Sequence, residues 1–272
     1  MSDRLLDAVT SGVTVYDLGR PMFAGMPQSP NHPPFHHSLP RRHGDRTRPD
    51  GTSAANDLLV TGTHVGTHID ALAHVSVDGR LFGGASASEA QTGGRFEQHG
   101  VHTIAPLLTR GLLLDVPTAL GQKALPPAHE ITVAELRTTC SRQQTAPGPG
   151  DVVLVRSGWG PRFDDGPEPY LGHDTGVPGV GEAGARWLAG TEPRAVGADT
   201  IAFEHLDPGS GHSSLPAHRV LLVERGVYII EALDLEQLAA DGVHEFTFVG
   251  IPLCLVGATG SPLRPLAVVG RG

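Results

Sequence analysis

Short runs of aliphatic and β-branched residues recur through the second half of the chain and predict the strands of a sheet. Several runs are continuously apolar rather than alternating, which is typical of central strands covered on both faces. The predicted strands are Gly111–Val116, Asp151–Gly158, Arg194–Asp199, Gly226–Leu233 and Ile251–Gly257.

Three helices are predicted between or beside these strands. Thr132–Cys140 opens with a threonine followed three residues later by a glutamate, the pattern of a capping box. Gly181–Gly190 is a second helix. Ser213–Gly226 is a third, with Ser213 as its N-cap, Pro216 near the first turn and a closing glycine.

The composition is that of a packed globular protein. Of the 272 residues, 39% are hydrophobic and 18% are charged, and the length suits one large domain or two small ones. We find no internal repeat and one composition shift, over residues 26–53. We therefore predict a single α/β domain over residues 1–272, with a mixed sheet flanked by helices.

Residues 26–53 are rich in proline, histidine and arginine, with no helical or strand period. A loop this long is either a functional lid or a solvated segment, and both interpretations stay open. A flap over a pocket would give Phe35, His36 and His37 a role in substrate contact. The alternative is that these residues, with His32 and His43, are solvated.

Charge and hydropathy exclude several classes of partner. A net charge of -9 and a pI near 5.9 argue against nucleic-acid or anionic-membrane binding. Without an apolar run of about eighteen residues or a signal sequence, we expect a cytoplasmic protein. Cys140 and Cys254 lie in unrelated contexts, so we expect free thiols rather than a disulfide.

The stretch "TGTHVGTHIDALAH" contains His64, His68, Asp70 and His74. A helix would rotate Asp70 away from His64, and a straight strand would separate the two by roughly 20 Å. Neither form lets three of these side chains meet one ion. We therefore predict a bend at Gly66, because glycine tolerates it, with the intervening apolar side facing the core. That side comprises Val65, Thr67 and Ile69.

Such a cluster points to a metal site. Burying unpaired ionisable groups is costly, and one cation satisfies several of them. Imidazole nitrogen and carboxylate oxygen suit zinc and manganese equally, so the residue types do not choose between the two metals. The alternative is a set of hydrogen-bonded histidines that hold a loop.

A second pair of residues extends this site. Glu231 follows the apolar run "GVYII", and His218 lies in the first turn of the preceding predicted helix. The helix–strand connection can bring the two together. They could form a second metal site, with Asp70 bridging two ions.

The motif "HVGTHIDALAH" resembles the H-x-G-T-H-x-D-x-P-x-H signature of the cyclase family of metal-dependent hydrolases, which includes bacterial arylformamidases and isatin hydrolases. The stretches "YDLGRPMFAGMP", "GDVVLVRSGW", "GADTIAFEH" and "GATGSPLRPLAVV" resemble other segments of that family. Leu72 stands where the family has proline. That position binds no metal, so the difference affects the choice of subfamily and not the expected chemistry. The chain length and the 26–53 loop resemble the isatin-hydrolase-like members more closely.

The resemblance implies a swivelling β/β/α-type fold, assembled as a homodimer or homotetramer. It implies that His64, His68 and Asp70 bind one divalent ion and that His74 is the catalytic base or acid. In two-metal members, Asp70 would bridge to a second ion bound by His218 and Glu231.

The expected reaction is hydrolysis of a small amide, formamide or lactam by a water that zinc or manganese activates. Arg264 is a candidate for binding a substrate carboxylate, with a surface salt bridge as the equal alternative. Two other functions stay open: a cyclase or dehydratase acting on a polyketide-like substrate, and a metal-binding protein without catalysis. The intact His74 argues against the second.

Overall fold

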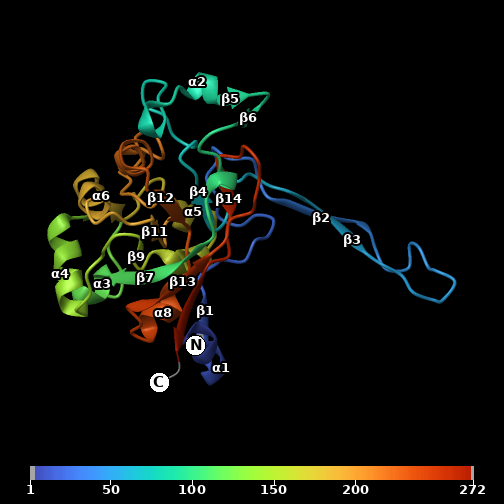
Figure 1. Cartoon of the computed structure of the whole chain (residues 1–272), viewed down its shortest axis with the longest axis horizontal. Helices are drawn as coiled ribbons and strands as arrows, with labels where there is room; N and C mark the ends of the chain where they lie inside the picture. Colours follow the sequence, from blue (N-terminus) through green and yellow to red (C-terminus); the bar gives the residue numbers. More distant parts are fainter. Residues whose placement is uncertain (1–3, 271–272) are drawn as a thin grey trace.

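The computed structural model describes residues 4–270, which are built around one curled sheet (Figure 1). The sheet has nine strands in the order β1-β15-β13-β7-β9-β11-β12-β4-β14. Strands β7, β9, β11 and β12 are mutually parallel, and their neighbours run antiparallel, so the predicted mixed sheet is confirmed. In spatial order the strands are Val13–Asp17, Leu266–Gly270, Glu245–Gly250, Leu107–Asp115, Val152–Arg156, Ala195–Ala198, Tyr228–Glu231, His68–Asp70 and Gly260–Pro262.

The helices are short and surround this sheet. The α-helices are α1 (Arg4–Ser11), α2 (Ala87–Ala90), α3 (Val116–Ala119), α4 (Val133–Gln143), α5 (Pro167–Leu171), α6 (Glu182–Ala189), α7 (Pro216–His218) and α8 (Glu236–Ala240). Helix α7 continues into a π-helix, η4 (Arg219–Arg225), and 3₁₀ turns occur at η1 (Phe82–Gly84), η2 (Val101–Thr103) and η3 (Gly160–Phe163). Three two-stranded sheets complete the structure: β2 (His36–Arg41) with β3 (Asn56–Val60), β5 (Gln91–Thr92) with β6 (Arg95–Phe96), and β8 (Glu130–Ile131) with β10 (Gly179–Val180).

The core lies on both faces of the central strands. Successive strand residues point to opposite faces. Val153 therefore packs in one apolar cluster, with α4, α6 and η4, while Leu154 packs in another, with β13, β15 and α8. Both side chains are fully buried. This arrangement explains why the central strands are apolar throughout, and it confirms four of the five predicted strands.

The fifth predicted strand, Ile251–Gly257, is wrong. Strand β13 ends at Gly250, and β14 begins at Gly260. The connecting segment lies on the surface, where Ile251 and Val256 are 62% and 64% exposed. Pro252 lacks the N–H that a strand ladder needs, so an apolar composition alone does not make this segment a strand.

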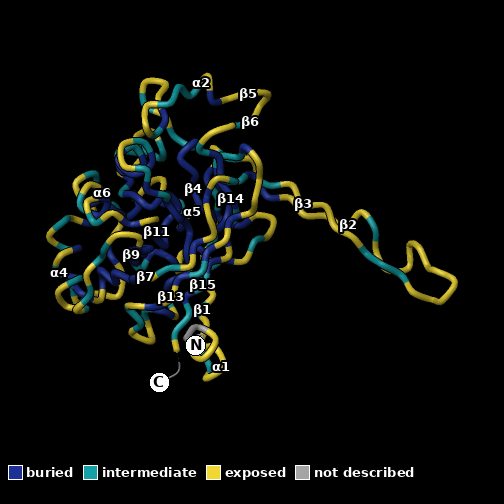
Figure 2. Tube along the Cα trace, in the orientation of Figure 1, coloured by how far each residue is buried: buried dark blue, intermediate teal, exposed yellow. Residues whose placement is uncertain are grey.

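The expectation of a loop without strand structure over residues 26–53 is wrong in part. His36–Arg41 form β2, which pairs antiparallel with β3 in a long hairpin. We call residues 36–60 the arm. It projects from the body of the molecule, and almost all of it is exposed (Figures 1 and 2). The preceding residues behave differently, because Ser29 and His32 line a buried cavity.

The third predicted helix begins later than its sequence suggested. Its N-cap is Leu215, without a side-chain cap, so the assignment of Ser213 as the cap is wrong. Pro216 occupies the first turn, and Gly226 closes the helix in the left-handed conformation at φ +67°, both as expected. The capping box of α4, between Thr132 and Glu135, is confirmed.

Two further expectations concern the thiols and the membrane. Cys140 and Cys254 are both free, as the sequence indicated. Within residues 4–270, no helix combines the length and the apolar character that a membrane span requires.

Candidate metal centre

The histidine-rich turn bends at Gly66, as its sequence predicts. Gly66 adopts φ +68°, a conformation that glycine reaches without strain. The bend feeds into β4, which lies between β12 and β14 and places His68 opposite Glu231. The expected core-facing side is confirmed, because its three residues are at most 2% exposed: Val65, Thr67 and Ile69.

Two imidazoles and two carboxylates meet at this strand pair. His68 Nε2 lies 3.5 Å from Asp70 Oδ1 and 3.3 Å from Glu231 Oε2. His218 Nε2 lies 3.1 Å from Glu231 Oε1 and 3.7 Å from Asp70 Oδ2. The helix–strand connection thus brings His218 and Glu231 together, as the sequence indicated.

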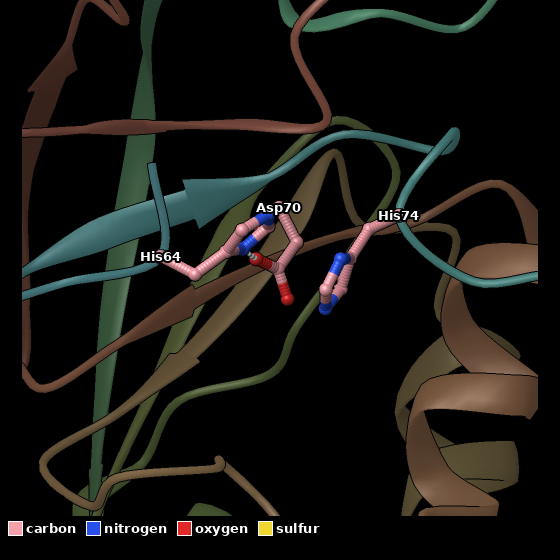
Figure 3. A group of neighbouring side chains, drawn as sticks. All are labelled: His64, Asp70 and His74. Carbon is pink, nitrogen blue, oxygen red and sulfur yellow. Dashed lines mark hydrogen bonds and ion pairs between the residues drawn. The ribbon is translucent and has the colours of Figure 1, made fainter. Parts of the chain in front are cut away.

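His64 and His74 complete the cluster, and Figure 3 shows the Asp70 carboxylate beside both rings. His64 Nδ1 lies 2.6 Å from Asp70 Oδ1, and the His64 and His74 rings stack with centroids 3.9 Å apart. Two groups of potential ligands therefore share Asp70, each with its donor atoms within 4.8 Å of one another. The groups are His64, Asp70 and His74, and His68, Asp70 and Glu231.

The unused ring nitrogens orient two of the histidines. His68 Nδ1 lies 2.8 Å from the Gly66 carbonyl oxygen, so it donates there and leaves Nε2 free to accept. His218 Nδ1 lies 2.7 Å from Glu204 Oε2. Hydrogen bonds of this kind fix the tautomer and orientation of metal-binding histidines.

The ionisable side chains of the centre have pKa values far from their usual ones. Burial by itself raises the pKa of Asp70 and of Glu231, but the neighbouring histidines outweigh it and hold both values low, Glu231 at about 2. Burial lowers the pKa of His68, yet hydrogen bonds to the two carboxylates raise it to about 10. His74 has no comparably close carboxylate partner, and burial lowers its pKa to about 4.

Two carboxylate oxygens show that the residues fit a cation. Asp70 Oδ2 and Glu231 Oε1 are buried, and neither makes a hydrogen bond among the described residues, although His218 Nε2 is within ion-pair distance of both. Leaving a buried carboxylate oxygen unsatisfied costs more than about 1 kcal/mol. A divalent ion among these nitrogen and oxygen atoms would satisfy both, and this donor set suits zinc or manganese.

Three residues of the site were not recognised from the sequence. Glu204, only 1% exposed, supports His218. His32 was assigned to solvent, but it stacks on His64 at 5.1 Å, and burial lowers its pKa to about 4. His212 lies in the loop that follows β11 and lines the same cavity. For Glu204 a signal exists, because "IAFE" places a carboxylate after apolar residues just as "GVYIIE" does.

The cavity over the cluster is small and adjoins a larger pocket. Its volume is about 30 Å³, enough for about one water molecule, and it is lined by the five clustered residues His64, His68, His74, His218 and Glu231 together with His32 and His212. A neighbouring pocket of about 470 Å³ shares Ser29 and His212 with it.

Neither predicted substrate contact lines the cavity or the neighbouring pocket. Phe35 is 8% exposed and packs in an apolar cluster with Val65 and Trp159, so it is a core residue. Arg264 is 81% exposed at its side chain, and its Nη2 pairs with Asp17 Oδ2 at 2.6 Å. The structure therefore favours the surface salt bridge for Arg264.

The chain resembles known proteins. The model of the putative cyclase family matches residues 16–205. The chain belongs to this family. The match includes the turn from His64 to His74 and also Glu204, whereas His218 and Glu231 lie beyond it.

Individual proteins resemble the chain over most of its length. Cyclase-like protein 3 of Oryza sativa subsp. japonica is 27% identical over 80% of this chain and 67% of its own length. Isatin hydrolase of Roseibium aggregatum is 26% identical over 81% of this chain and 77% of its own.

Solved structures agree on the fold. The crystal structure of a novel cyclase superimposes with a TM-score of 0.84 at 27% identity, covering 98% of this chain and 93% of its own. An isatin hydrolase bound to the product analogue thioisatinate gives a TM-score of 0.72 at 22% identity, with both chains fully covered. The second likeness concerns the fold alone.

Proposed function

We propose that this member of the cyclase family is a metal-dependent hydrolase that cleaves the C–N bond of a small amide, formamide or lactam. The observation that carries the proposal is the pair of unsatisfied buried oxygens, Asp70 Oδ2 and Glu231 Oε1, which both lie within ion-pair distance of His218 Nε2. The likeness to an isatin hydrolase over 81% of the chain supports the lactam as one substrate class.

The residues divide into two ligand groups in this proposal. His64, His68 and Asp70 would hold one divalent ion, zinc or manganese, and His218 and Glu231, together with Asp70, would hold a second. Bound there, such an ion would supply an activated water and a polarised substrate carbonyl. The burial of all five side chains excludes bulk water from the reacting atoms.

His74 moves the proton. Its ring stacks against His64 beside the cavity, and its low pKa keeps it neutral near pH 7, ready to accept a proton. Working as a general base and then as a general acid, His74 takes the proton of the attacking water and delivers it to the leaving nitrogen. His74 is also close enough to Asp70 to be a ligand, so its role needs a direct test.

The shape of the site limits the substrate to a small molecule. The inner cavity of about 30 Å³ admits only the reacting group, and the adjoining pocket of about 470 Å³ accommodates the remainder. Ser29 and His212 belong to both spaces, so a substrate passes between them.

Metal analysis combined with substrate turnover tests the proposal. The metal content of tag-free protein is measured by plasma mass spectrometry for the wild type, for His218→Ala and for the control His36→Ala on the exposed arm. Hydrolysis of isatin and of N-formylaniline is followed in parallel. We expect about two equivalents in the wild type and the control, about one in His218→Ala, and turnover of at least one substrate.

Other outcomes separate the alternatives. One equivalent in all three proteins would place His218 outside the metal shell and remove the second ion. Bound metal without hydrolysis of either amide would favour the cyclase or dehydratase function, or a metal-binding protein without catalysis. Absence of metal even after addition of zinc or manganese would overturn the hydrolase proposal.

A further inference from the structure

The pocket beside the inner cavity is formed by three segments from different parts of the chain. We call this space of about 470 Å³ the outer pocket. Its walls come from within residues 29–31, 171–173 and 206–213. Gly209 N donates a hydrogen bond to the His173 carbonyl oxygen at 2.7 Å, which ties the last two segments together. The outer pocket is therefore a built feature of the fold.

The outer pocket contains no formally charged side chain. Among the described residues that line it there is no lysine, arginine, aspartate or glutamate. Leu171 and Leu206 give it apolar surface, and Asn31 and three serines give it neutral hydrogen-bonding groups. Its ionisable side chains are two histidines, His173 and His212. Whether the pocket can bind a charged group therefore depends on these two rings.

His212 does not supply a positive charge. Its Nδ1 lies 3.4 Å from Ser29 Oγ, which accepts a hydrogen bond from Asn31 N at 3.3 Å. Ser29 is 3% exposed, and its hydroxyl proton has no other acceptor among the described residues, so the hydroxyl donates to Nδ1. A ring nitrogen that accepts a hydrogen bond carries no proton. Burial also lowers the pKa of His212, so the ring is neutral near pH 7 and its proton lies on Nε2.

The other ionisable groups around the outer pocket do not favour an anion either. His173 is an exposed residue, so water and salt screen any charge on it. Asp174 and Asp207, both exposed, directly follow two of the lining residues and make the surroundings acidic. Arg264, the candidate for binding a substrate carboxylate, lines a different groove. A carboxylate in the outer pocket would lose water without gaining a counter-ion, which is unfavourable.

We propose that the outer pocket selects substrates whose bound group is uncharged and rejects those that carry a carboxylate there. The inner cavity holds only the reacting group, so the remainder of the substrate occupies the outer pocket. An uncharged ring would pack on Leu171 and Leu206, and its carbonyl or amide substituents would bond the serines and the Nε2–H of His212. Amides of amino acids that keep a free carboxylate are excluded. The inference rests on the proposed function, because it assigns the reacting group to the inner cavity.

Two formanilides that differ mainly in charge test this selectivity: para-formamidobenzamide and para-formamidobenzoate. Near pH 7 we expect kcat/KM for the neutral amide to exceed that for the acid by at least about 10-fold, because the carboxylate must be desolvated without a partner. The ratio kcat/KM is compared because an acid that binds backwards at the metal centre lowers kcat and KM together and leaves their ratio unchanged. Equal values, or a preference for the acid, would overturn the inference.

A single added charge in the outer pocket should reverse the preference. Asn31 is exposed, its side chain makes no hydrogen bond among the described residues, and its backbone N keeps the bond to Ser29 in any variant. In Asn31→Arg, the guanidinium can pair with the carboxylate, so kcat/KM for the acid should rise by at least about 10-fold and that for the amide should change by less than about 3-fold. The control is Thr92→Arg, on β5 outside both cavities. An equal rise in the control would overturn the assignment to the outer pocket.

Calorimetric binding separates a failure of this inference from a failure of the proposed function. If neither formanilide is hydrolysed, the proposed function fails, and Kd values test the outer pocket by themselves. The acid should then bind Asn31→Arg at least about 10-fold more tightly than it binds the wild type or Thr92→Arg, and the amide should bind all three alike. Hydrolysis of both compounds without preference, and without a response to Asn31→Arg, would overturn the selectivity and leave the hydrolase proposal standing. Circular dichroism checks folding, and Asn31→Lys repeats the test with a second cation.

Discussion

Glu204 holds His218 in place by three hydrogen bonds at the start of helix α7. Its Oε2 accepts from the His218 ring Nδ1 at 2.7 Å and from the His218 backbone N at 3.0 Å, and its Oε1 accepts from Ala217 N at 3.1 Å. One buried carboxylate thus caps the helix and turns His218 Nε2 toward Glu231. The helix has no side-chain cap of its own, so Glu204 takes that role from a distant segment.

Replacing Glu204 by glutamine should weaken metal binding through His218. Glu204→Gln keeps the size of the side chain but removes the charge that holds the ring, and changes of this kind typically reduce metal affinity by roughly 10–100-fold. Competition with a fluorescent chelator measures the affinity. Glu97→Gln, on the exposed surface, is the control and should bind as the wild type does. An unchanged affinity in Glu204→Gln would mean that His218 is not a ligand.

Gly260 leaves room for the His64 ring. A Cβ at this position would lie 2.5 Å from His64 Cε1 and 2.9 Å from the Ile69 carbonyl oxygen, closer than real contacts allow. Gly260→Ala should therefore displace His64 and lower metal affinity by at least about 10-fold, the smaller effect expected when a ligand is misoriented. Gly148→Ala is the matched control, because its nearest neighbour would be 3.8 Å away. Equal metal affinity in the two variants would remove His64 from the ligand set.

His74→Ala separates a proton-transfer role from a ligand role. If His74 is the base, the variant should keep its metal content and lose about 10²–10⁴-fold in kcat. Plasma mass spectrometry and an isatin or formamide assay give the two readouts, with His36→Ala on the arm as control. Loss of one metal equivalent would make His74 a ligand instead, and retained turnover would show that the proton is moved by another group.

The capping box of α4 predicts a pH-dependent stability. Burial raises the pKa of Glu135, but hydrogen bonds from the Thr132 backbone and side chain outweigh it and leave the pKa below its usual 4.5. Because the folded pKa is depressed, the ionised Glu135 stabilises the protein above pH 4.5, and this contribution is lost as the pH falls through the folded value. The Glu135→Gln variant should therefore have a lower Tm than the wild type at pH 7, and the two Tm values should converge toward pH 3.

Thermal melts from pH 7 to pH 3 measure this difference. Loss of a helix cap typically costs about 1 kcal/mol, so the shift at pH 7 should be a few degrees at most. Glu168→Gln, an exposed glutamate of α5, serves as the control. A Tm difference between wild type and Glu135→Gln that persists unchanged at pH 3 would contradict the assignment.

Local features of the centre could be predicted from the sequence because the turn is short and densely constrained. Within residues 64–74, helical and extended geometries both fail to gather the side chains, so Gly66 had to bend the chain. The capping box of α4 was predictable for the same reason, since its partners lie three residues apart. The apolar runs of β9 and β11 were equally clear, because burial on both faces leaves no polar positions.

Contacts between distant segments were less accessible to sequence reasoning. Ile251–Gly257 is as apolar as a central strand, yet no strand within residues 4–270 pairs with it, and composition does not encode pairing. His32 was unrecognised because nothing in a proline-rich loop indicates that its ring stacks on His64, 32 residues away. Phe35, the residue immediately before β2, belongs to the core for the same kind of reason, because its neighbours there come from distant segments.

The sequence by itself determined the chemistry of this protein: a bent turn with three histidines and an aspartate, held between apolar residues that had to be buried. Only the tertiary structure decided how the centre is completed. Strand pairing sets Glu231 opposite His68, and Glu204 reaches the start of α7 from 14 residues away. Local geometry follows from adjacent residues through steric limits on the backbone. The assembly of distant side chains follows from packing of the whole core, which no short stretch contains.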